Sequence, residues 1–244
     1  MTDTSGRTRR PRWLTVFGLV TLAVVGVGLY AALIVSPPDV NQGDLIRVMY
    51  AHVPVAWIGF AAVAVSAFWG MLYLWRGRAV DDVRAQGTAE AALLYSVLTV
   101  VGGMTYSKPT LNTYWTWDAK LTLTALMVAL VVGYFIVRAL IEDPQRRARV
   151  SAVIMLVVLV SLPFNYLAAE WFRTLHPAKS INLDGSGVTM DPAMVRVLLI
   201  NVLGGAMVFV YFISERIRIG RLALADDKTF DSVKGVAREV VSVR

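Results

Sequence analysis

Six apolar stretches, each close to the length of a membrane-spanning helix, follow one another along the chain. Short polar segments separate them, and they cover residues 13–35, 54–75, 89–106, 121–140, 150–169 and 194–213. A helix needs about 20 apolar residues to cross a bilayer, and lipid tolerates only structures that satisfy their own backbone polar groups. The pattern therefore predicts an all-α integral membrane protein with six transmembrane helices.

The segments outside these stretches predict a simple organisation. Residues 1–12 form an N-terminal segment, residues 13–215 a membrane domain with a tryptophan-rich loop at 107–120, and residues 216–244 a tail. The first stretch follows four arginines, as a signal peptide would, but it is too long and lacks a small-residue cleavage site. We expect it to be retained as the first helix.

Positive charge is distributed unevenly between the two sides of the predicted bundle. Eighteen of the 24 Lys and Arg residues fall at the N-terminus, in the second and fourth gaps and in the tail, and six fall in the other gaps. Cytoplasmic loops carry the excess of Lys and Arg, so both termini are predicted to be cytoplasmic. The net charge of +7 then reflects topology, and we expect no nucleic-acid partner.

Composition narrows the chemistry that the chain can perform. Of 244 residues, 57% are hydrophobic and only 17% charged, which excludes an ordinary soluble domain. The absence of cysteine excludes disulfides, thiolate metal sites and cysteine nucleophiles. No phosphate-binding G-x-x-x-x-G-K-[ST] motif occurs, so the chain does not hydrolyse ATP by that route. Nor do we find a catalytic constellation with supporting context, and we predict no enzyme.

Both histidines of the protein, His52 and His176, fall in gaps on the outer side, next to the second and fifth apolar stretches. Imidazole is the commonest nitrogen ligand of transition metals, and two imidazoles can supply both axial bonds of a haem iron. The alternative is that each is an ordinary interfacial residue, solvated or hydrogen-bonded to a helix end.

The third gap concentrates large aromatic residues directly before an acidic one. Tyr114, Trp115 and Trp117 precede Asp118, which is also placed to cap the fourth helix. Aromatic belts at membrane surfaces are an alternative explanation, but a dense cluster forms a rigid wall suited to stacking on a porphyrin. Possible partners for haem propionates on this side are Arg47, Lys108, Lys120, Arg173 and Lys179.

Three segments, in this order, resemble a known family. Residues 47–54 (RVMYAHVP), 114–122 (YWTWDAKLT) and 170–176 (EWFRTLH) are similar to motifs of the tryptophan-rich "WWD" haem-handling membrane proteins, and in particular of the haem exporter protein C family of system I cytochrome c maturation. The likeness extends from about residue 12 to residue 216 and includes the order of six helices.

The resemblance implies a multi-pass protein of the bacterial inner membrane whose tryptophan-rich loop faces the periplasm and binds haem b for transfer. It assigns His52 and His176 as axial ligands of the haem iron. The remaining site residues that it implies are Tyr114, Trp115, Trp117, Asp118 and Lys120. It also implies partners in the bilayer: a membrane-anchored periplasmic haem chaperone, ATPase and permease subunits of an ABC complex, and a small single-span subunit.

The loop departs from the usual family form at four positions. Leu111 replaces a Trp, Asn112 a Gly, Tyr114 a Trp and Lys120 an Arg. Tyr114 keeps the aromatic bulk and Lys120 the positive charge, although lysine lacks the bidentate fork of arginine.

Two other functions are compatible with paired outer histidines. A haem-bearing electron carrier would hold its haem permanently, usually between histidines inside helices. A haem-translocating permease would need a polar path through the membrane, yet the apolar stretches contain few charges.

Overall fold

The structure is a computed structural model that describes residues 10–176 and 190–242, with side chains as far as Asp226. The described residues contain six helices that are long and apolar enough to cross a membrane, which confirms the predicted number. They are α2 (Arg12–Tyr30), extended by the π-helical turn η1 (Ala31–Val35), α3 (Met49–Arg76), preceded by the 3-10 turn η2 (Asp44–Val48), α4 (Ala79–Leu111), α5 (Ala119–Leu140), α6 (Pro144–Trp171) and α7 (Pro192–Ser242).

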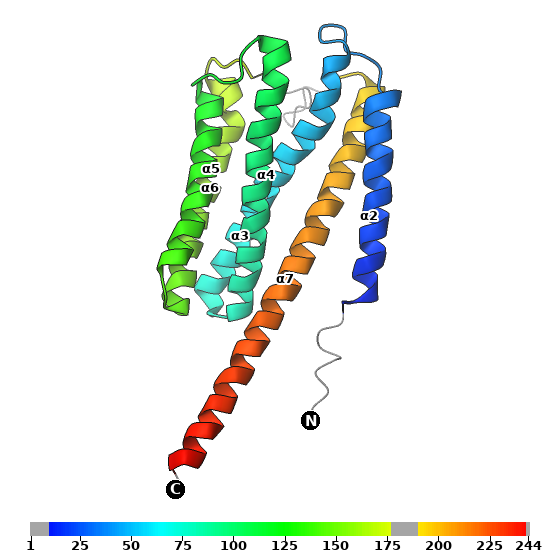
Figure 1. Cartoon of the computed structure of the whole chain (residues 1–244). Helices are drawn as coiled ribbons and strands as arrows, with labels where there is room; N and C mark the ends of the chain where they lie inside the picture. Colours follow the sequence, from blue (N-terminus) through cyan, green and yellow to red (C-terminus); the bar gives the residue numbers. More distant parts are fainter. Residues whose placement is uncertain (1–9, 177–189, 243–244) are drawn as a thin grey trace.

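The helices form an elongated bundle in which α2 packs along α7, while α3, α4, α5 and α6 form a second group (Figure 1). The start of α2 and the far end of α7 lie at one end of the bundle. The connections before α3, between α4 and α5 and after α6 lie at the other end. We call this second end the outer end. It brings together the three segments that resemble family motifs, residues 47–54, 114–122 and 170–176.

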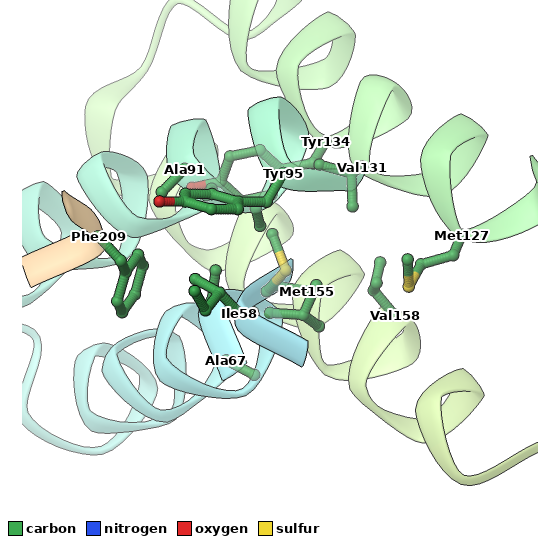
Figure 2. Packing of buried hydrophobic residues seen from close by; sticks show 14 residues of the cluster. Ile58, Ala67, Ala91, Tyr95, Met127, Val131, Tyr134, Met155, Val158 and Phe209 are labelled. Carbon is green, nitrogen blue, oxygen red and sulfur yellow. The ribbon is translucent and has the colours of Figure 1, made fainter. Parts of the chain in front are cut away.

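A core of small and medium side chains holds the second group of helices together. Figure 2 shows Ile58 and Ala67 of α3, Tyr95 of α4 and Met155 of α6 around this core, with Phe209 of α7 closing one side. Fully buried alanines let the helices approach closely, which is how helices associate where lipid removes the hydrophobic driving force.

A second contact joins α2 to α7. The side-chain amide of Asn201 donates to the carbonyl oxygen of Gly28 over 3.1 Å. A Cβ at Gly28 would lie 3.0 Å from that Asn201 side chain, so this glycine permits the close approach of the two helices.

The structure changes one predicted boundary, and a second does not coincide with the end of a helix. Helix α4 runs to Leu111, so the loop predicted at 107–120 is shorter and covers 112–118; we call these residues the tryptophan-rich loop. Asn112 ends α4 in the left-handed conformation, with φ of 56°, and Lys108 donates to its backbone and side-chain oxygens. Helix α7 continues without a break through the boundary predicted at residues 215 and 216.

Candidate functional site

His52 lies in the first turn of α3, at the outer end of the bundle, and its ring packs against two glycines of α4. A Cβ at Gly102 would lie 3.2 Å from the ring nitrogen Nδ1, and a Cβ at Gly103 would lie 3.2 Å from Cε1. We call Gly102 and Gly103 the glycine seat. Any larger residue at either position would press on the imidazole, so the seat fixes where this ring lies.

Two buried nitrogen atoms near the outer end have no hydrogen-bond partner among the residues that the structure describes. They are Nδ1 of His52 and the indole Nε1 of Trp115. Buried polar groups are normally paired, and an unpaired one at a cleft or helix end indicates a place where a ligand or water completes the site. The two groups, an imidazole and an indole at the same end of the bundle, are of the kinds that bind a transition metal and stack on a flat aromatic ligand.

The tryptophan-rich loop presents two of its three large aromatics outward. Tyr114 is 56% exposed and Trp117 is 79% exposed, whereas Trp115 is half-buried. The rings of Trp115 and Trp117 meet edge to face, with centroids 5.5 Å apart. The ammonium of Lys108 lies 5.4 Å from the centre of the Tyr114 ring. The loop is thus an open aromatic surface supported from beneath by Trp115.

Asp118 follows the aromatics and caps α5, as the sequence predicts. Its Oδ1 accepts from the amide of Leu121 over 3.0 Å. Its Oδ2 accepts from the hydroxyl of Thr116 over 3.0 Å and from the amide of Leu175 over 3.3 Å. The same carboxylate therefore touches both the tryptophan-rich loop and the segment after α6.

These bonds keep Asp118 ionised. Burial raises the pKa of Asp118, but the donors Leu121, Thr116, Thr174 and Leu175 together outweigh it, so the pKa lies below its ordinary value. A carboxyl with a lowered pKa stabilises the folded state above its unfolded pKa of about 4, and this contribution is lost as the pH falls through the lowered value.

We therefore expect Asp118→Asn to reduce the stability of the protein at pH 7 by about 1.5 kcal/mol, the contribution of a hydrogen bond to a charged group. Because protonation removes the same contribution from the wild type, the difference should shrink as the pH falls below about 4. Unfolding midpoints of both proteins in detergent, measured between pH 7 and pH 3, test this. A difference that is constant across this range would contradict the assignment.

His176 is exposed and lies in the segment of residues 172–176, which follows α6 and which we call the His176 segment. Its backbone amide donates to the Thr174 hydroxyl over 3.1 Å. The side chains of His176 and Lys120 both lie within electrostatic reach of His52. The fold thus brings together two histidines that are 124 positions apart in the chain.

Lys120, in the first turn of α5, reaches across to α6. Its ammonium donates to the backbone oxygen of Asn165 over 2.7 Å and to the Asn165 side chain over 3.1 Å. Asn165 is 1% exposed and donates in turn to the hydroxyl of Thr124 over 3.1 Å. The ring of Phe60 lies 5.7 Å from the same ammonium. Lys120 therefore fixes the start of α5 against α6.

Of the other cations proposed on this side, none converges on His52 in the described residues. Arg47 pairs with Asp44 over 2.8 Å, Lys108 bonds Asn112, and Arg173 is exposed. Lys179 lies outside the described residues.

Sequence reasoning missed the glycine seat and the partner of Lys120. The glycine pair is visible as a Gly-Gly dipeptide inside an apolar stretch, which indicates close approach of another group. Asn165 is visible as a polar residue inside an apolar stretch, and in the structure it accepts from the ammonium of Lys120.

The fold and the site define a class: a membrane protein with six candidate spanning helices that carries two histidines and an aromatic loop at the same end of the bundle. The family model described as Heme exporter protein C matches residues 6–229, and the chain belongs to this family. Heme exporter protein C of Bradyrhizobium diazoefficiens is 30% identical over 200 residues, covering 81% of this chain and 73% of that protein.

Two further relatives extend the comparison. Heme exporter protein C of Escherichia coli K12 is 30% identical over 185 residues, covering 75% of this chain and 71% of that protein. A putative cytochrome c biosynthesis ccmC-like mitochondrial protein of Marchantia polymorpha is 26% identical over 165 residues, covering 68% of this chain and 70% of its own.

Proposed function

We propose that this protein handles haem for the maturation of c-type cytochromes, by binding haem b at its outer end and presenting it to a haem chaperone. The observation that carries the proposal is that the fold places His52 and His176 at the same end of the bundle, within electrostatic reach of each other, where the tryptophan-rich loop exposes two aromatic side chains. Membership of the Heme exporter protein C family supports the choice of haem, and the printed name of the Marchantia relative supports the link to cytochrome c biosynthesis.

Each residue has a separate part in the proposed site. His52 and His176 would hold the haem iron, because each offers an imidazole and they come from different parts of the chain, α3 and the His176 segment. Tyr114 and Trp117 supply exposed faces for stacking on the macrocycle, with Trp115 beneath them. Lys120 contributes a positive charge close to His52 that attracts a propionate, while it also holds α5 to α6.

The proposed setting is the bacterial inner membrane, with the outer end in the periplasm. The excess of Lys and Arg at the opposite end supports this orientation through the positive-inside rule. The chaperone is membrane-anchored and reaches the site from the periplasm. ATPase and permease subunits of an ABC complex supply ATP hydrolysis, with a small single-span subunit, since this chain has no phosphate-binding motif.

The absorption spectrum of the purified protein, produced together with its haem chaperone, tests the proposal. We expect a Soret band, and we expect that haem to pass to added haem-free chaperone. Haem that is retained and cycles with quinol would support an electron carrier instead. A protein that binds no haem under these conditions would refute the proposal.

Replacing Gly102 with valine is expected to lower haem affinity by about 10-fold to 100-fold, the usual cost of disturbing groups that orient a metal ligand. The reason is that a side chain there would displace the His52 ring, which its Cβ would already approach to 3.2 Å. Haem titration in detergent measures the effect.

Gly133→Val is the matched control, because a Cβ at Gly133 meets nothing within 4 Å. Both substitutions introduce the same β-branched residue into a membrane helix. Equal loss of haem in the two variants would show that helix perturbation, and not the glycine seat, is responsible.

A further inference from the structure

The carboxylate of Asp118 bonds on two sides at once. Oδ1 accepts from the Leu121 amide at the start of α5, which is all that capping the helix requires. Oδ2 accepts from Thr116 inside the tryptophan-rich loop and from the Leu175 amide, which is 57 positions away in the chain. The second oxygen is therefore used for a contact between two separate segments.

Another acidic cap in the same protein lacks this second contact. Asp143 caps α6 at the opposite end of the bundle, where its Oδ1 accepts from the Arg146 amide over 2.6 Å. No bond from the Asp143 side chain to a distant segment is found among the described residues. The comparison separates the capping role, which both aspartates share, from the bridge that Asp118 makes in addition.

The bridge ends directly beside His176. The amide of Leu175 donates to Asp118, and Leu175 directly precedes His176. The amide of His176 in turn donates to the hydroxyl of Thr174. The Thr174 side chain also lies close enough to the Asp118 carboxylate to lower its pKa. Asp118 and Thr174 thus fix the backbone on both sides of the peptide that leads into His176.

We propose that Asp118 is a positioning residue for His176. It fastens the His176 segment to the tryptophan-rich loop, so that the His176 imidazole and the aromatic side chains of the loop are held in one arrangement. This inference rests on the proposed haem function for its purpose, but not for its geometry. In this role Asp118 acts on the site through Leu175 and Thr174, whereas the family resemblance implies that it contacts haem directly. Both carboxylate oxygens already accept hydrogen bonds from protein groups, and a carboxylate would repel haem propionates.

Asp118→Asn separates the two roles. Asparagine caps helices about as well as aspartate does, but its amide has a single acceptor oxygen and cannot accept on both sides. Thr174→Val is a second variant that weakens the same bridge while leaving the cap intact. Asp143→Asn is the matched control, since it makes the same chemical change at a cap that has no bridge.

The first readout concerns structure alone. The chain contains no cysteine, so nitroxide labels can be attached to a single introduced pair, Leu111→Cys and Leu175→Cys, both of which replace exposed side chains. Pulsed electron spin resonance on the full-length protein in nanodiscs then gives the distribution of distances between α4 and the His176 segment. We expect a narrow distribution in the wild type and with Asp143→Asn, and a broad one with Asp118→Asn and with Thr174→Val.

The second readout is the spectrum of bound haem. We expect Asp118→Asn and Thr174→Val to convert part of the low-spin, six-coordinate haem to a five-coordinate form and to release haem about tenfold faster, the effect of losing one hydrogen bond to a charged group. Asp143→Asn should leave both the spectrum and the release rate unchanged.

The two readouts keep the inference apart from the proposed function. If the distance distribution is the same in Asp118→Asn as in the wild type, the positioning role is wrong, whatever the haem spectrum shows. If the distribution broadens but the wild type binds no haem, the bridge stands and the proposed function fails. If the distribution broadens and the bound haem is unaffected, Asp118 fastens the segment without positioning an iron ligand, and the inference is overturned.

Discussion

Replacement of His52 by alanine is expected to lower the affinity of the protein for haem by at least about 100-fold. Changes to residues that merely support a metal ligand cost 10-fold to 100-fold, and loss of the ligand itself should cost no less. The imidazole lies in the glycine seat, so its removal also leaves a space beside Gly102 and Gly103.

His176→Ala should lower haem affinity by a similar factor, but it should reduce the stability of the haem-free protein less. His176 is exposed, whereas His52 is half-buried in α3. We therefore expect His52→Ala to lower the unfolding midpoint of the haem-free protein more than His176→Ala does. The contrast separates the loss of a ligand from the loss of packing.

Haem titration followed by absorption spectroscopy measures both variants, with Val53→Ala as the control for truncation of a half-buried side chain in the same turn as His52. Free imidazole should restore a low-spin spectrum in His52→Ala by occupying the vacated space. If both histidine variants bind haem as the wild type does, the histidines are ordinary interfacial residues and the proposed site is wrong.

The second large effect is expected at the other end of the bundle. Arg138 of α5 makes two hydrogen bonds to the carboxylate of Asp82 in α4, of 2.7 and 3.0 Å, and donates to Gln86 over 2.8 Å. Its side chain is 8% exposed, and that of Asp82 is 18% exposed. Removing one partner of a buried ion pair leaves the other charge buried and costs about 3–5 kcal/mol.

We therefore expect Arg138→Leu to reduce the free energy of unfolding by about 3 kcal/mol, at the lower end of that range because the pair lies near one end of the helices. Combining it with Asp82→Leu should recover most of the loss, since no charge is then left without its partner. Unfolding in detergent provides the measurement, and Arg146→Leu, an exposed arginine near the same end, is the control. A double variant as unstable as the single one would indicate that lost packing, and not the unpaired carboxylate, sets the cost.

Local patterns in the sequence were sufficient to predict the membrane-spanning helices of the fold. The number of spanning helices follows from the length of each apolar stretch, because each helix must satisfy its own backbone in lipid, and the structure confirms six. The helix boundaries were less accurate. Helix α4 begins ten residues before the predicted stretch, at Ala79, because its polar first turns are stabilised by ion pairs, such as Arg78 with Asp81, that hydropathy does not register.

The sequence by itself determined which residue types the outer end offers: two histidines, a cluster of aromatics, and an aspartate placed to cap a helix. These features depend on neighbours in the chain, and the cap of α5 is confirmed. Only the tertiary structure decided how they meet. The glycine seat and the bond from Lys120 to Asn165 each join different helices, and His52 and His176 come within electrostatic reach of each other from distant segments. Such contacts depend on how helices cross and pack, and no periodicity within a single segment encodes them.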